Sequence, residues 1–205
     1  METLAPSSIE WGVASRALPG QHASGDLSVV KSFEDGVLVA VLDGVGHGEE
    51  AAMAAAAAAA ILEAHPAERL TLLVQRCHEA LRATRGVTMS VASFNVSRGL
   101  VAWLGVGNVE GVLLRRGFAL SAAEKSLMLR AGVVGLQLPS LEVEVFQVAP
   151  GDTLIFATDG IHTDFTRGSA RKYPPRTAAE SILTRHGKTT DDALVLVARY
   201  LRNRP

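Results

Sequence analysis

The sequence contains little cysteine and few aromatic residues. Cys77 is the single cysteine among 205 residues, which excludes an internal disulfide. It lies beside apolar residues where a helix is expected, which favours a buried thiol over the alternative, a reactive thiol. Because aromatic residues make up only 5% of the chain, aliphatic residues and alanine must fill most of the core.

Neither sign of charge is in excess, since 20 Lys and Arg residues stand against 21 Asp and Glu residues, a net charge of −1. The sequence therefore lacks the overall basic field with which proteins bind nucleic acid or anionic membranes. Arginines do gather toward the C-terminus, and they form either a solvated face or a docking surface for an acidic or phosphorylated partner. These arginines are Arg167, Arg171, Arg176 and Arg185.

Long apolar segments are also missing. The longest apolar run in the sequence, residues 51–62, is too short to span a bilayer and has glutamates at both ends. The first residues lack the basic and apolar regions of a signal peptide, so we expect a cytoplasmic protein. The length suits one domain and no repeat or long linker divides the chain, so we expect residues 1–205 to form a single domain.

Three stretches predict helices. Residues 49–64 are mostly alanine, the best helix former, and their small side chains would allow the helix to pack closely on a sheet. Pro66 suits the first turn of a second helix over residues 67–84, where apolar residues recur at helical spacing. A third helix is expected at residues 177–185.

The remaining apolar patterns predict strands. The continuous apolar run at residues 37–42 is typical of a strand buried on both faces. From Gly86 onward, strand follows strand with polar or glycine breaks, an order that indicates antiparallel sheets rather than alternating βαβ units. We therefore predict an α+β fold in which helices cover the faces of sheets. The expected strands are residues 10–16, 28–33, 37–42, 88–96, 100–106, 111–115, 141–148, 153–157 and 193–200.

Four acidic segments spread along the chain are its most informative feature. Two of them follow apolar strands as Asp-Gly pairs, which places a carboxylate at the rim of a sheet and lets another group approach the glycine backbone. Alone, such an aspartate could simply cap the next helix. Converging carboxylates would repel one another, and divalent cations such as Mg²⁺ or Mn²⁺ would remove that repulsion. The segments are Gly25-Asp26, Asp43-Gly44-Val45-Gly46-His47-Gly48, Thr158-Asp159-Gly160 and Asp191-Asp192.

This ordered set resembles the metal-dependent serine/threonine protein phosphatases of the protein phosphatase 2C (PP2C) type, in their bacterial SpoIIE-like branch. The likeness covers nearly the whole chain. Three further segments resemble, more narrowly, the RsbX-type members of that branch, which act on stressosome proteins. They are Arg76-Cys77-His78-Glu79-Ala80-Leu81, Arg85-Gly86-Val87-Thr88-Met89-Ser90 and Gly105-Val106-Gly107-Asn108-Val109.

The resemblance implies a fold and a set of metal ligands. The fold would be a four-layer αββα sandwich, two antiparallel sheets flanked by helices. Asp43 would bridge two Mn²⁺ or Mg²⁺ ions, and the Gly44 carbonyl would bind one of them. Asp159 and Asp191 would bind the other, and Asp26 would act nearby, directly or through water. Asp43, Asp159 and Asp191 are thus the predicted catalytic residues, and the nucleophile would be a metal-bound hydroxide.

The family pattern is incomplete in two places. The loop before the alanine-rich helix contains His47, but it does not show the histidine that the eukaryotic enzymes are proposed to use as an acid. The candidates for the acid are therefore water on a metal, His47 and His162. No clear phosphate-binding arginine lies in the first strand, where Arg16 is a candidate. Asn108 is expected to close a turn between strands rather than to contact substrate.

The expected activity is removal of phosphate from phosphoserine or phosphothreonine in STAS-domain proteins of a stressosome-like complex. The alternative is a non-catalytic module with a phosphatase fold that docks on signalling proteins. A hydrolase of small phosphoesters is a third reading. The acidic segments favour an enzyme, because a scaffold has no need of them, and the lack of a strong cationic pocket motif disfavours the small-phosphoester hydrolase.

Overall fold

The computed structural model describes residues 8–21, 23–116, 124–166 and 172–201. Within these residues the chain forms two five-stranded sheets and three α-helices. The helices are α1 (Glu49–Ala64), α2 (Leu70–Ala80) and α3 (Pro175–His186). The strands are β1 (Ile9–Arg16), β2 (Asp26–Phe33), β3 (Gly36–Gly44), β4 (Val87–Asn95), β5 (Leu100–Val106), β6 (Glu110–Leu114), β7 (Glu124–Ser126), β8 (Glu144–Gln147), β9 (Thr153–Ala157) and β10 (Ala193–Tyr200).

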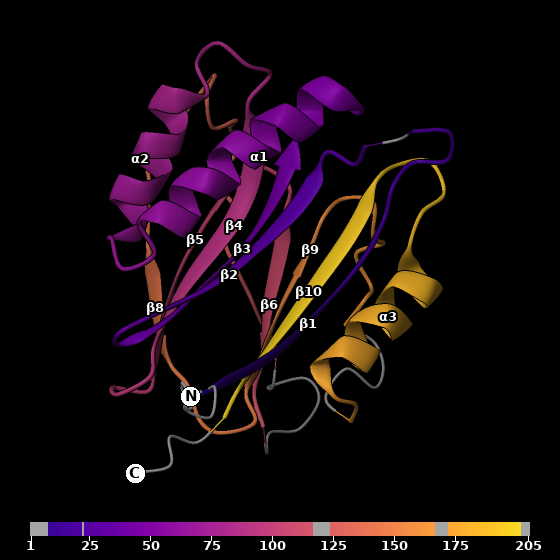
Figure 1. Cartoon of the computed structure of the whole chain (residues 1–205). Coiled ribbons are helices and arrows are strands. Elements are labelled where there is room, and N and C mark those ends of the chain that lie inside the picture. The colour runs from indigo at the N-terminus through magenta and orange to yellow at the C-terminus, as the bar shows by residue number, and fades with distance from the viewer. Residues whose placement is uncertain (1–7, 22, 117–123, 167–171, 202–205) are drawn as a thin grey trace, which may run out of the picture.

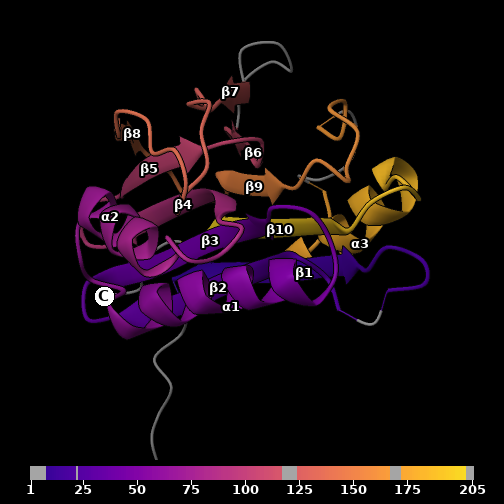
Figure 2. The same ribbon diagram turned by 90° about the horizontal axis from the view of Figure 1, so that it is seen from above.

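The two sheets pack face to face, and helices cover their outer faces. One sheet has the strand order β1-β10-β9-β6-β7 and the other β2-β3-β4-β5-β8, with antiparallel pairing throughout. Figure 1 shows α1 and α2 over the second sheet and α3 beside β1 and β10 of the first. Figure 2, seen from above, shows α1 alongside β2 and α3 near β10. The predicted four-layer αββα sandwich is confirmed.

The apolar run that predicted a doubly buried strand forms most of β3. Leu38 and Leu42 belong to the apolar layer between this sheet and helices α1 and α2. Val39 and Val41 belong to the layer between the two sheets. Because successive side chains of a strand point to opposite faces, one continuous run serves two layers at once.

The alanine-rich segment forms α1 with the predicted bounds. Its buried face consists of small side chains, including Ala54 and Ala58, which have no exposed surface. The close packing brings the Cys77 thiol of α2 to 3.8 Å from the Ala58 carbonyl oxygen. Burial raises the pKa of Cys77 to about 12, so the predicted buried thiol is confirmed and a reactive thiolate is disfavoured.

Three elements differ most from the prediction. Helix α2 is shorter than the expected 67–84, because residues 66–68 and 81–84 form turns and bends. Strand β8 is shorter than the expected 141–148, because residues 141–143 lie outside the paired strand. The sequence does not predict β7, since its residues are all exposed and show no apolar alternation.

The surface expectations have a partial outcome. Arg167 and Arg171 lie outside the described residues. Arg176 is exposed on α3 and pairs with Glu180 at the next helical turn, as expected of a solvated helix face. No helix among the described residues is long and apolar enough to cross a membrane.

The buried face of α1 provides a stability test. Ala58→Leu would force a larger side chain into the layer beside α2, so we expect it to lower the free energy of unfolding by about 1–3 kcal/mol. Ala57→Leu, at an exposed position of the same helix, should change this free energy by less than about 0.5 kcal/mol. Urea denaturation followed by circular dichroism measures both. Equal effects of the two substitutions would contradict the close packing of α1.

Candidate active site

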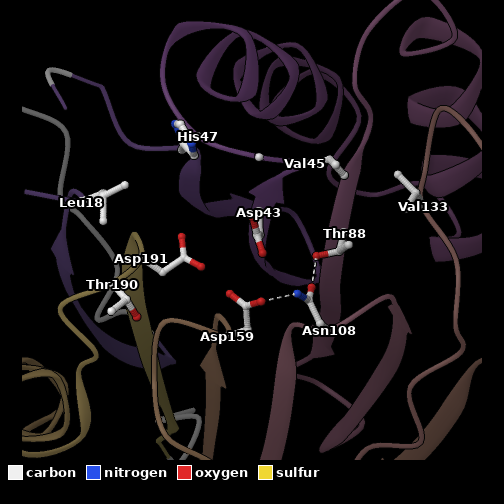
Figure 3. Close-up of a pocket in the computed structure, with 11 residues that line it drawn as sticks. Leu18, Asp43, Val45, His47, Thr88, Asn108, Val133, Asp159, Thr190 and Asp191 are labelled. Carbon is white, nitrogen blue, oxygen red and sulfur yellow. Dashed lines mark hydrogen bonds between the residues drawn. The ribbon is translucent and has the colours of Figure 1, made fainter.

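A pocket of about 410 Å³ opens where strands of both sheets end. Figure 3 shows the carboxylates of Asp43, Asp159 and Asp191 facing a common space in this pocket. Three of the predicted metal ligands, from distant parts of the sequence, therefore come together. The lining residues are Leu18, Asp43, Val45, Gly46, His47, Thr88, Asn108, Val133, Asp159, Thr190 and Asp191.

Asp43 and Gly44 are the last two residues of β3, where Asp43 lies opposite Asp26 of β2. Gly44 is buried, and its amide donates to the Gly25 carbonyl at 3.0 Å. A Cβ on Gly44 would overlap the carbonyl oxygen of Ala51, so glycine lets α1 close over the end of β3. This agrees with the close backbone approach predicted for the Asp-Gly pair.

The loop after Gly44 turns the chain into α1 without help from Asp43. The N-cap residue is Gly48, with φ 77°, and no side chain of the described residues caps the helix. Gly46 also has a positive φ, 93°, a conformation that favours glycine. The alternative in which Asp43 serves as a helix cap is therefore wrong, and its side chain lines the pocket instead.

Asp159 and Asp191 come from the other sheet. Asp159 lies just after β9, and Asp191 lies just before β10, the antiparallel neighbour of β9. A Cβ on Gly160 would overlap the carbonyl oxygen of Asp192, so glycine again allows two segments to approach. Lys188 Nζ donates to the Asp159 carbonyl oxygen at 2.6 Å and ties the same turn. The pairing of β9 with β10 thus sets Asp159 beside Asp191.

Two further carboxylates lie behind the pocket lining and connect the sheets. Asp26 is buried, and its Oδ2 accepts a hydrogen bond of 2.7 Å from the Thr158 hydroxyl. Asp192 is also buried and accepts hydrogen bonds of 2.7 Å from the amides of Leu18 and Gly25. Asp26 therefore stands next to the pocket rather than in its lining, and its part in metal binding stays a prediction.

Burial and like charge raise the pKa of two of these acids. Burial raises the pKa of Asp43 to about 8, and the charges of Asp26, Asp159 and Asp191 contribute in the same direction. Burial also raises the pKa of Asp26 to about 7, while the hydrogen bond from Thr158 acts in the opposite direction. Among the described residues, no Lys or Arg lines the pocket. The acids therefore converge without a Lys or Arg side chain in the lining to neutralise them.

The donor set suits a hard divalent cation. Carboxylate and carbonyl oxygens are ligands that Mg²⁺ and Mn²⁺ prefer, and a cation would supply the positive charge that the pocket walls lack. In the described parts of the chain, no three Asp, Glu, His or Cys side chains are gathered into a ready-made metal cluster. The carboxylates share a space without closing into a cage, as expected of groups that repel one another.

The candidates for proton donor and phosphate binder are placed differently. His47 is exposed and lines the pocket, whereas His162 is exposed and lies outside the lining. Arg16, at the end of β1, donates to the Lys188 carbonyl and also lies outside the lining. Its Nε is buried without a hydrogen-bond partner among the described residues. Of these candidates only His47 lines the pocket, whereas Arg16 contacts the main chain.

Two polar residues have a place in the site that the sequence does not indicate. Asn108 occupies the expected turn between strands, yet its side chain also lines the pocket and donates to Asp159 Oδ2 at 2.8 Å. Thr88, near the start of β4, donates to the Asn108 side chain. These bonds join residues 51 and 20 positions apart, so no local sequence pattern reveals them.

The sequence matches the family model described as Stage II sporulation protein E (SpoIIE) over residues 34–201. It is also 30% identical, over 94 residues, to the phosphoserine phosphatase RsbX of Bacillus subtilis (strain 168). That match covers 46% of this chain and 47% of RsbX, so it spans about half the length of each protein.

Solved structures of the same fold cover the chain almost completely. One of them comes from work on the bacterial stressosome as a modular system adapted to control secondary messenger signalling. It is 29% identical to this chain, with a TM-score of 0.84, and the match covers 93% of this chain and 99% of that chain. RsbX in complex with magnesium is 21% identical, with a TM-score of 0.80 and coverage of 93% and 94%. The PP2C phosphatase domain of Bacillus subtilis SpoIIE, with a fragment of its regulatory domain, is 21% identical, with a TM-score of 0.77 and coverage of 96% and 64%.

The raised pKa of Asp43 predicts how the stability of the metal-free protein depends on pH. The folded protein keeps the Asp43 proton up to about pH 8, whereas the unfolded chain loses it near the ordinary value of 3.8. Between these values the folded state binds more protons, so the free energy of unfolding should fall as pH rises. Thermal unfolding in the presence of a chelator measures this trend.

A matched pair of variants isolates the contribution of Asp43. Asp43→Asn removes the titrating group, so the metal-free variant should be more stable than the wild type near about pH 8 and should lose that advantage toward about pH 4. Asp35→Asn, in the exposed turn between β2 and β3, should follow the wild-type curve. An Asp43→Asn curve parallel to that of the wild type would contradict the half-buried, charge-crowded environment of Asp43.

Proposed function

Because the chain belongs to the SpoIIE family and shares the fold of PP2C phosphatase domains, we propose that it is a metal-dependent protein phosphatase acting on phosphoserine and phosphothreonine. The observation that carries this proposal is the pocket in which Asp43, Asp159 and Asp191 meet from both sheets. A fold alone does not define an activity, but a pocket that gathers acids, one of them with a strongly raised pKa, is typical of a functional site.

We assign the predicted roles to these residues. Asp43 would bridge two cations, because it faces the acids of the opposite sheet, and the Gly44 carbonyl would bind one of the ions. Asp159 and Asp191 would hold the second ion, and Asp26 would support the site from behind the lining. Bound Mg²⁺ or Mn²⁺ would activate water as the nucleophile and neutralise charge on the transferred phosphoryl group.

The pocket wall supplies a candidate for the proton transfer to the leaving group. His47 is exposed at the pocket, and imidazole can both donate and accept a proton near neutral pH. It would protonate the serine or threonine oxygen as the phosphate leaves, which is the usual task of a general acid. Since the lining of the described residues contains no Lys or Arg to hold a free phosphate ester, substrate selection would depend on the protein that carries the phosphate.

We infer that the substrates are phosphorylated STAS-domain proteins of a stressosome-like complex in the cytoplasm. The likeness to RsbX and the likeness to a structure from work on the stressosome support this substrate class. The nearly balanced charge of the chain agrees with a protein partner rather than a nucleic acid.

Phosphate release from a phosphorylated STAS-domain protein tests the activity. The purified protein should release phosphate only with Mn²⁺ or Mg²⁺, and a chelator should stop the reaction. Asp159→Asn should lower kcat at least about 100-fold, because it removes a charge on which the reacting centre depends. Asp164→Asn, in the same loop, changes an exposed acid that pairs with His186 and should keep wild-type kcat.

The other readings give different results in the same assays. No phosphate release with either metal, combined with stable binding of the partner, would favour a non-catalytic docking module. Faster turnover of para-nitrophenyl phosphate than of the phosphoprotein would favour a hydrolase of small phosphoesters. Wild-type kcat in Asp159→Asn would contradict the metal role of that residue.

A further inference from the structure

Three polar side chains form a hydrogen-bonded chain across the rim of the pocket. Asn108 Nδ2, in the turn between β5 and β6, donates to Asp159 Oδ2 at 2.8 Å. The Thr88 hydroxyl, near the start of β4, donates to Asn108 Oδ1. Figure 3 shows all three side chains in the wall of the pocket. Neither Thr88 nor Asn108 has a role in the function proposed above.

The chemistry of the three groups fixes the direction of each bond. A carboxylate can only accept hydrogen bonds, so the Asn108 amide must turn its Nδ2 toward Asp159. Its Oδ1 then faces Thr88, and the hydroxyl must donate, because an amide oxygen can only accept. Thr88 therefore holds the Asn108 amide in the one orientation that serves Asp159.

Asn108 lines the pocket in which carboxylates of different sheets meet. Asp159 follows a strand of one sheet, whereas Asp43 ends a strand of the other. Asn108 donates its side-chain hydrogen bond to the first of these two, Asp159. The amide is neutral, so it binds Asp159 without a positive charge that would compete with a cation for the carboxylates.

We propose that Asn108 is a positioning residue of the cation site, which orients the Asp159 carboxylate, while Thr88 holds the amide. The bond to Oδ2 leaves Oδ1 of Asp159 for a cation. The inference rests on the proposed function, because it concerns the same metal ions. Partners that orient metal ligands typically contribute about 10–100-fold to metal affinity.

The turn that carries Asn108 does not depend on its side chain. Gly107, with φ 94°, turns the chain after β5, and its amide donates to the Arg130 carbonyl at 2.8 Å. A Cβ on Gly107 would overlap the Thr88 side chain, so glycine also lets Thr88 pack under the turn. These features remain when the Asn108 side chain is removed, so its effect on metal binding can be measured in a folded protein.

Calorimetric titration of the metal-free full chain with Mn²⁺ alone tests the proposal without a substrate. Asn108→Ala should raise the Kd for Mn²⁺ about 10–100-fold. Thr88→Val keeps the shape of threonine but loses the hydroxyl, so it should raise Kd by a smaller factor of about 3–10. Thr88→Ser keeps the hydroxyl and should bring Kd back to within about twofold of the wild type.

Asn95→Ala provides the matched control. Asn95 is the last residue of β4, at the opposite end of that strand, where its Oδ1 accepts hydrogen bonds from the Ser97 hydroxyl and the Arg98 amide of the following turn. Its replacement removes comparable bonds away from the pocket, so the Kd for Mn²⁺ should equal that of the wild type. A weakening as large as that of Asn108→Ala would show a general loss of structure and overturn the proposal.

The remaining outcomes separate this inference from the proposed function. Wild-type Kd in Asn108→Ala, with weakened binding in Asp159→Asn, would overturn the positioning role and leave the cation site intact. A wild type that does not bind Mn²⁺ would overturn both. If Asn108→Ala does not fold, the two Thr88 variants test the proposal. Equal Kd values for Mn²⁺ in Thr88→Val and Thr88→Ser would overturn it.

Discussion

The apolar layer between the two sheets is the contact on which the site depends. Trp103 of one sheet and Phe156 of the other are fully buried and meet edge to face, with ring centroids 5.6 Å apart. Asp43 ends a strand in the sheet of Trp103, and Asp159 follows the strand that contains Phe156. How closely the sheets pack therefore sets the distance between these carboxylates, and no single loop can do so.

Hydrogen bonds across the sheets oppose the repulsion that this convergence creates. Thr158 donates to Asp26, and Asn108 donates to Asp159. Asp192 adds a third link, because its carboxylate accepts hydrogen bonds from the Leu18 and Gly25 amides in the segment before β2. These bonds hold the carboxylates in place, which would reduce the rearrangement that the proposed metal binding requires.

Local patterns in the sequence predict the layers and the acids, but not the contacts that join them. The apolar run at residues 37–42 and the alanine-rich helix each carry a complete local signal, whereas exposed β7 carries none. Asp43 and Asp159 are recognisable as Asp-Gly pairs after apolar strands, and the family match confirms the SpoIIE-like resemblance drawn from them. The places of Thr88 and Asn108 depend on bonds between distant segments, which exist only once the sheets have packed.

The acids, rather than the fold, argue for catalysis. Solved structures with about one residue in five identical share this sandwich, and the sandwich alone specifies no chemistry. A docking module of the same fold would gain stability by replacing Asp43, whose carboxyl is half-buried among like charges. The same arrangement becomes favourable when a divalent cation binds, because a ligand that binds only the folded state stabilises it. Metal binding would therefore link the stability of this end of the sandwich to its activity, so that the carboxylates that weaken the metal-free protein would be the ones that hold the ions.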